Sequence, residues 1–221
     1  VINAGLATTS HFMAVDITNA KRPWINTTYI SDMPNHINLD FDIQDNVAYI
    51  LSSKYVGVDS FQLHVTKKQL FPQNELAGAL NGSETQIETF SLPYAQIPIA
   101  TSIKAIGELL YIVSNDFLYI YSTIGNNVNQ PIVRLSDTIS SETDLKFRDI
   151  EISGNYAYIY AETQTGLGKI VTFDITDPEN PLEILPAVTN WSSGAGDSLP
   201  SKMTLVGNRI FTIGNGVVRG G

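Results

Sequence analysis

The chain has 221 residues, a formal net charge of −9, 43% hydrophobic residues and no cysteine. The length and the hydrophobic content suit a folded domain with a substantial core, and they exclude a disordered segment. The lack of Cys excludes disulfides and thiolate metal sites. The acidic net charge argues against nucleic acid or an anionic membrane as partner. No apolar run reaches the roughly 18 residues of a membrane span.

Short segments of alternating polar and apolar residues, separated by Gly, Asn and Pro, predict β-strands throughout the chain. In chain order the predicted strands cover 12–17 and 24–30; 37–43, 47–52, 60–65 and 86–92; 102–106, 109–114, 117–122 and 132–135; 146–152, 156–161, 169–175 and 182–188; and 202–206 and 209–213. A long insertion at 67–85, with a short helical turn near 74–80, interrupts the second group. Long loops on a rigid scaffold often carry recognition.

One phrase recurs along the chain. The segment 154–159 (GNYAYI) returns as 45–50 (DNVAYI), 107–112 (GELLYI) and 207–212 (GNRIFT), and the segment 171–181 (VTFDITDPENP) returns in part at 15–23 (VDITNAKRP). The aromatic anchors Tyr49, Tyr111, Tyr158 and Phe211 lie 47 to 62 residues apart, which is the period of propeller blades. The pattern therefore predicts an all-β chain, a β-propeller of four-stranded antiparallel blades.

The segments 148–159 and 171–181 resemble the LVIVD-repeat β-propeller family. The resemblance extends over most of the chain: it is good around Tyr158 and Asp16, fair around Tyr49 and poor around Tyr111, where 119–122 (YIYS) replaces the expected Asp-Ile-Thr-Asp-Pro stretch. It implies a propeller on an exported or surface protein, often one module of a larger polypeptide. It brings no shared set of catalytic residues.

We therefore expect residues 1–221 to form a single β-propeller domain or a fragment of one. Partial blades are expected at 1–31 and 202–221, and complete blades at about 37–92, 102–135 and 146–188. Two closures remain open. The two half-blades complete one another in a four-bladed ring, or the chain is part of a larger ring; the second is favoured because four blades is the lower limit for propellers.

A search for chemistry in the sequence finds no catalytic constellation. The histidines His11, His36 and His64 lack metal-ligand spacing, and there is no Gly-x-Ser-x-Gly nucleophile elbow. We therefore predict no catalytic residue, no metal site and no cofactor. Oxygen ligands do cluster at 42–46 and 174–177, where calcium stays an alternative. The preferred interpretation is that Asp16 and Asp174 bind backbone N–H groups of the following turns.

Aligning the repeats on their aromatic anchors places Asp40, Ser102, Asp149 and Lys202 at the start of each first strand, with Arg148 beside Asp149. In propellers this end of the inner strands lines the central channel, so these five residues are candidates for a polar funnel. The alternative is that each caps a turn or pairs with a neighbour on the adjoining blade.

The function expected from these features is non-catalytic: an extracellular or cell-surface binding scaffold, or a surface-assembly module, with a protein or glycan as partner. Sequons at Asn26, Asn81 and Asn190 are glycosylation candidates, although a chain this rich in Asn, Ser and Thr contains about three by chance. Two alternatives stay open: a hydrolase or lyase at the channel mouth near Asp40, Arg148, Asp149 and Lys202, and a homo-oligomeric structural subunit of a filament or surface layer.

Overall fold

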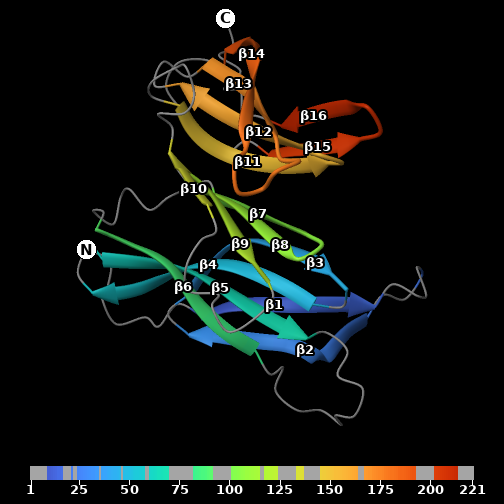
Figure 1. Cartoon of the computed structure of the whole chain (residues 1–221). Coiled ribbons are helices and arrows are strands. Elements are labelled where there is room, and N and C mark those ends of the chain that lie inside the picture. The colour runs from blue at the N-terminus through green and yellow to red at the C-terminus, as the bar shows by residue number, and fades with distance from the viewer. Residues whose placement is uncertain are drawn as a thin grey trace, which may run out of the picture. The chain divides into compact units, whose positions relative to one another are not determined.

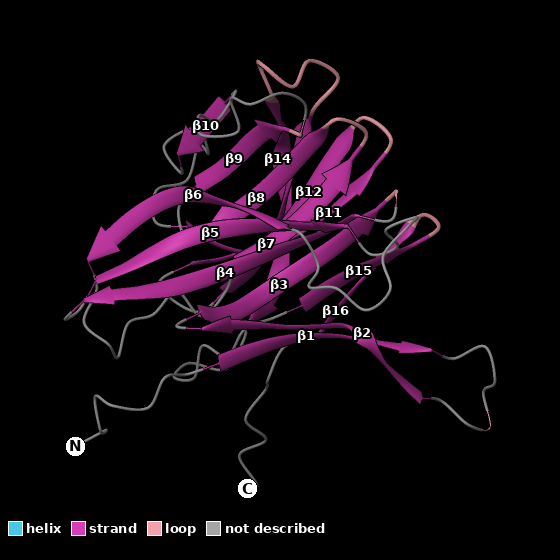
Figure 2. Ribbon diagram, turned by 90° about the horizontal axis from the view of Figure 1, so that it is seen from below, coloured by secondary structure: helices cyan, strands magenta, loops and turns pink. Residues whose placement is uncertain are grey.

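The computed structural model describes residues 9–16, 21, 24–34, 36–45, 47–57, 60–69, 82–91, 101–114, 117–123, 133–136, 145–163, 167–192 and 202–213. The elements in this part of the chain are antiparallel β-strands joined by turns (Figures 1 and 2). The chain divides into two compact units, Val1–Ala95 and Gln96–Gly221. Over these described ranges, no helix long and apolar enough to cross a membrane is found.

The described residues of the first unit form two sheets. One is the hairpin of β1 (Thr9–Asp16) and β2 (Trp24–Pro34). The other has the sequential order β3-β4-β5-β6, formed by β3 (His36–Gln44), β4 (Val47–Gly57), β5 (Ser60–Gln69) and β6 (Gly82–Ser91).

The part of the second unit that the structure describes forms three sheets, again with neighbouring strands in chain order. The first consists of β7 (Thr101–Ile106), β8 (Leu109–Ser114), β9 (Phe117–Ser122) and β10 (Val133–Ser136). The second consists of β11 (Leu145–Ser153), β12 (Tyr156–Thr163), β13 (Leu167–Asp174) and β14 (Leu182–Ser192). The third is the hairpin of β15 (Lys202–Val206) and β16 (Arg209–Ile213).

For the residues that the structure describes, the all-β, antiparallel architecture expected from the sequence is confirmed, with sheets of two and four strands. The predicted insertion at 67–85 was wrong at both ends. Strand β5 continues to Gln69, opposite Val47, and β6 begins at Gly82, opposite Lys68. The ladder continued because backbone pairing does not require the alternating pattern used to find strands. The short helical turn near 74–80 lies outside the described residues.

The opening hairpins of four sheets share one register. The equivalent pairs are Asp40 with Leu51, Ser102 with Val113, Asp149 with Tyr160, and Lys202 with Ile213. Each hairpin then turns on a residue with positive φ, which is 50° at Asp45, 59° at Gly107, 57° at Gly154 and 61° at Gly207. Two-residue hairpin turns require this backbone, and glycine adopts it without steric cost. The repeated phrase in the sequence therefore encodes a repeated hairpin.

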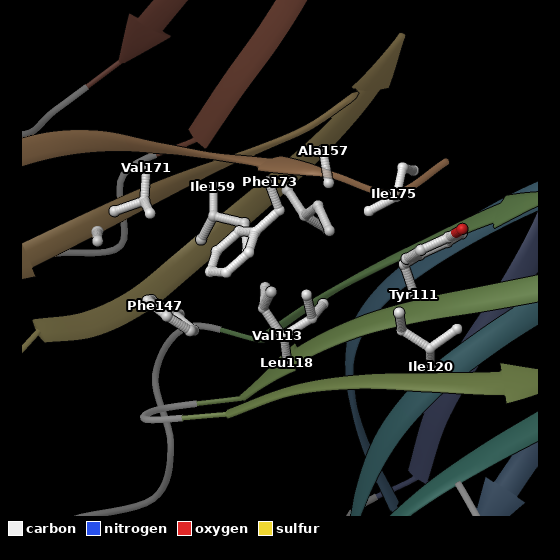
Figure 3. Close-up of a cluster of buried hydrophobic side chains, with 12 residues drawn as sticks. Tyr111, Val113, Leu118, Ile120, Phe147, Ala157, Ile159, Val171, Phe173 and Ile175 are labelled. Carbon is white, nitrogen blue, oxygen red and sulfur yellow. The ribbon is translucent and has the colours of Figure 1, made fainter. Parts of the chain in front are cut away.

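The core of the second unit lies between its stacked sheets. One cluster joins β8 and β9 to one face of the β11–β14 sheet (Figure 3); its buried members are Tyr111, Val113, Leu118, Ile120, Phe147, Ile150, Ala157, Ile159, Ala161, Val171, Phe173 and Ile175. On the opposite face of that sheet, Tyr160 and Ile170 pack with Met203 of β15. Burying each large aliphatic side chain contributes about 1.5–3 kcal/mol. The β11–β14 sheet is thus covered on both faces, and β11 lies next to both β7 and β15.

Candidate functional site

A β-bulge precedes two of the predicted funnel residues. In β11 the pairing passes from Phe147 opposite Ala161 to Asp149 opposite Tyr160, so Arg148 is the extra residue. The same shift occurs in β3 just before Asp40. Because a bulge bends the strand and redirects the side chains next to it, it sets the direction in which each carboxylate leaves its strand.

The carboxylate of Asp149 links β11 to β15, which are the first strands of two neighbouring sheets. It is 3% exposed, its Oδ2 accepts a hydrogen bond from the backbone N–H of Met203, and its Oδ1 lies 3.4 Å from Lys202 Nζ. A buried carboxylate is tolerated only when it is hydrogen-bonded or paired. The structure therefore brings the candidates Asp149 and Lys202 together, as a link between β11 and β15.

The candidate Arg148 does not join this pair. Its Nε donates to Glu162 Oε2 at 3.2 Å, and Glu162 lies on the adjacent strand β12 of the same sheet. A further ion pair, Lys104 Nζ to Glu151 Oε2 at 3.2 Å, links β7 to β11. The carboxylates of Asp149, Glu151 and Glu162 thus each form an ion pair with a basic side chain of another strand.

The remaining candidates lie elsewhere. Ser102 is buried on β7, at 1% exposure. Asp40 is half-buried on β3 in the first unit. Among the sequons, Asn26 lies in β2 opposite Ala14 and Asn190 lies in β14, whereas Asn81 is outside the described residues. Within the described ranges, no three His, Cys, Asp or Glu side chains gather in a way that could hold a metal ion.

The Asp-Pro turn after β13 behaves as expected for Asp174. Its Oδ1 accepts the backbone N–H of Thr176 at 2.9 Å, and Asp177 accepts from the backbone N–H of Glu179 at 3.0 Å and from Asn180 Nδ2 at 2.9 Å. Hydrogen bonds from the side chain and backbone of Thr176 lower the pKa of Asp174. Those from Asn180 and from the Glu179 backbone lower the pKa of Asp177. Both carboxylates therefore stabilise their own turn.

The sheet β3–β6 carries a row of buried and half-buried polar side chains that sequence reasoning missed. Asn38, Ser52 and His64 are cross-strand neighbours on one face, at positions where the β11–β14 sheet has Phe147, Ala161 and Lys169. Ser52 is fully buried, and its hydroxyl has no hydrogen-bond partner among the described residues. This face is therefore more polar than its counterpart in the second unit.

A second missed feature is a set of exposed apolar side chains at the turn end of the second unit. Four exposed apolar side chains flank the turns of its three sheets: Ile106 (43% exposed), Tyr156 (42%), Leu182 (68%) and Val206 (61%). Ile106 and Val206 directly precede the turn glycines, and Tyr156 follows one. Leu182 adjoins Tyr156 through their common neighbour Asp174. We call these four residues the turn-end surface.

The four residues lie at one end of the second unit because its three sheets are stacked in register. The links from Lys104 to Glu151 and from Lys202 to Asp149 join corresponding repeat positions of consecutive first strands. Corresponding turns therefore lie at the same end of the stack. For Ile106 and Val206 the signal was available in the sequence as an apolar residue next to the turn glycine. Only the stacking shows that all four residues share one end.

Comparisons with known proteins add no assignment: a scan against protein-family models, a search of curated proteins and a search of solved structures each found no match.

Proposed function

We propose that the sheets are blades of a β-propeller and that the chain is a non-catalytic interaction scaffold. Support for blades comes from the sequential order of the four-stranded sheets, the common register of their opening hairpins and the stacking of sheets in the second unit. Propeller blades pack face to face with their first strands adjacent, and β7, β11 and β15 are arranged in this way. The resemblance to LVIVD repeats points to the same architecture.

The observation that carries the binding role is the turn-end surface. Contiguous exposed apolar patches mark interaction sites, and we infer that these four side chains form one. Turns on rigid scaffolds commonly hold binding residues. Tyr156 adds a ring that packs on apolar groups or on a sugar face while its hydroxyl stays in water. A protein or a glycan is the class of ligand that suits this surface.

The charged residues near the first strands support a non-catalytic role. Asp149, Lys202, Arg148 and Glu162 are bound to one another or to backbone. A general acid or base must reach the substrate, whereas the Asp149 carboxylate is buried against a neighbouring strand.

The binding role is tested on glycan arrays and on a panel of surface-protein ectodomains, with labelled wild-type chain and the double variant Tyr156→Ser/Val206→Ser. We expect wild-type binding that falls about tenfold or more in the variant, since hot-spot side chains each contribute 1–2 kcal/mol or more. The matched control is Phe211→Ser, because Phe211 is an exposed apolar residue of the same unit (51% exposed) outside the turn-end surface.

Two results would contradict this proposal. One is binding that is equally strong in the wild type and in the double variant. The other is turnover of a glycan or peptide that Lys202→Met abolishes without lowering the melting temperature, which would indicate an enzyme using the first-strand charges.

We further propose an extracellular or cell-surface location, supported by a sequence rich in uncharged polar residues and by the three sequons. The test is the intact mass of the natively produced protein before and after glycosidase treatment. A mass that falls on treatment supports export and the use of Asn26, Asn81 or Asn190. An unchanged mass excludes their glycosylation.

A further inference from the structure

The turn end of the second unit is acidic as well as apolar. Its described segments are 105–109, 153–156, 174–184 and 205–209, which hold three hairpin turns and the Asp-Pro turn. Five carboxylates and one basic side chain give these segments a net charge of −4: Glu108, Asp174, Asp177, Glu179 and Glu183 against Arg209. A small part of the chain therefore carries nearly half of its net charge of −9. Figure 1 shows the β7–β8, β11–β12 and β15–β16 turns on the same side of the second unit.

The Asp-Pro turn lies next to the β11–β12 turn. The backbone N–H of Ile175 donates to the carbonyl of Asn155 at 2.8 Å. Asp174 faces Tyr156 on one neighbouring strand and Leu182 on the other. Directly opposed residues of antiparallel strands have Cβ atoms about 4.5–5.5 Å apart. The Asp174 carboxylate is therefore in one row with two exposed apolar residues of the turn-end surface.

The carboxylates of the Asp-Pro turn keep their negative charge. Asp174 accepts hydrogen bonds from Thr176, and Asp177 accepts them from the Glu179 backbone and from the Asn180 amide. None of these donor groups is charged, and the hydrogen bonds lower the pKa of both carboxyls. The carboxylates of β11, in contrast, are paired with basic side chains. The turn carboxylates are thus ionised at neutral pH and held in place by their own turn.

We propose that the turn-end surface binds a basic protein segment, in which Lys or Arg side chains lie next to apolar ones. This inference rests on the proposed function and names its partner. A cation bound at Asp174 has the Tyr156 ring on one side and the Leu182 side chain on the other. An aromatic ring attracts a cation over its face, and the aliphatic stem of Lys or Arg packs on apolar groups.

Charge complementarity favours a basic protein segment over the other ligand classes. Opposite potentials steer two surfaces together and exclude wrongly charged partners. A neutral glycan gains no charge attraction from these carboxylates, and a phosphate-rich ligand is repelled. Because the turn already holds Asp174 and Asp177, binding loses little side-chain entropy there.

The test measures binding of the wild-type chain to three short labelled peptides by fluorescence anisotropy. In the basic peptide, Arg alternates with Leu and Tyr; in the two matched peptides, Ser or Glu replaces every Arg. We expect the basic peptide to bind most tightly and the Glu peptide least tightly. We also expect the affinity for the basic peptide to fall as salt rises from about 20 mM to about 200 mM, since screening weakens attraction between exposed charges.

Two double variants with the same change of charge locate the effect. Asp174→Asn/Glu179→Gln removes two charges from the turn end, and an amide oxygen at 174 still accepts the Thr176 N–H. Asp42→Asn/Asp45→Asn removes two charges from the first unit, where Asn suits the turn conformation of Asp45. We expect the first variant to bind the basic peptide about threefold to tenfold more weakly, because each exposed ion pair contributes little. The second should bind as the wild type does.

The outcomes separate this inference from the proposed function. Both stand if the basic peptide is lost with Tyr156→Ser/Val206→Ser and weakened only by the turn-end charge variant. The inference alone is overturned if a glycan, or an acidic or neutral protein, needs Tyr156 and Val206 but binds Asp174→Asn/Glu179→Gln unchanged. It is also overturned if the wild type does not prefer the basic peptide, or if both charge variants weaken binding equally. Binding that is insensitive to Tyr156→Ser/Val206→Ser overturns the proposed function as well.

Discussion

Replacing Asp149 by alanine removes the acceptor that joins β11 to β15. The N–H of Met203, a residue only 5% exposed, then loses a charged partner, which costs about 1.5–3 kcal/mol. The side chain of Lys202 is 49% exposed and regains water, so the lost ion pair adds less than about 1 kcal/mol. We expect Asp149→Ala to lower the free energy of unfolding by about 2–3 kcal/mol.

Two further variants separate the two contributions. Asp149→Asn keeps an oxygen acceptor and should cost less than Asp149→Ala, and Lys202→Met should cost less than about 1 kcal/mol. The assay is urea unfolding followed by circular dichroism, with melting temperature as a check; about 2–4 °C per kcal/mol is expected for a chain of this size. The reasoning would be refuted if Lys202→Met lowered the free energy of unfolding as much as Asp149→Ala does. It would also be refuted if the Asp149→Ala variant were as stable as the wild type.

The remaining predictions concern the core, the turns and acid stability. Ile159→Val removes one methylene from the fully buried cluster and should cost about 0.5–1.5 kcal/mol in urea unfolding; no measurable loss would contradict the packing. Gly154→Ala should lower the free energy of unfolding by about 1–2 kcal/mol. The cost comes from the positive φ alone, since no atom lies within 4 Å of the added Cβ. Asp45→Gly should not destabilise its turn. The pKa values of Asp174 and Asp177 should lie below the ordinary 3.8 in an NMR pH series. Because folding lowers these pKa values, the stabilisation is present above the unfolded pKa and is lost as the pH falls through the folded pKa. Measured pKa values at or above 3.8 would contradict the turn geometry.

The sequence predicted the strands well because the hairpins repeat. Turn residues such as Gly107 and Gly154 adopt positive φ, and aromatic anchors such as Tyr111 are buried on the pleated surface, so turn chemistry and hydrophobic pattern agree. Strand ends were less predictable. Strand β5 continues through Lys67 and Lys68, which no apolar alternation marks, because backbone hydrogen bonds extend the ladder.

The candidate site was only partly predictable. The alignment placed Asp149 and Lys202 at equivalent repeat positions, and the structure brings the two side chains together because equivalent positions of the first strands β11 and β15 adjoin. It did not show that the carboxylate binds the backbone of Met203, nor that Arg148 occupies a bulge and bonds to Glu162. Those contacts depend on the bulge and on the stacking of two sheets, and neither leaves a pattern in the sequence.

The measurement that tests the proposed function most directly is hydrogen exchange of the wild-type chain, with and without the glycan or protein ligand found on the arrays. The proposal expects ligand-dependent protection at the hairpin turns around 105–109, 153–156 and 205–209, with residues 146–150 and 202–203 unchanged. Protection at 146–150 and 202–203, with none at the turns, would place the ligand on the first strands and contradict the proposed function.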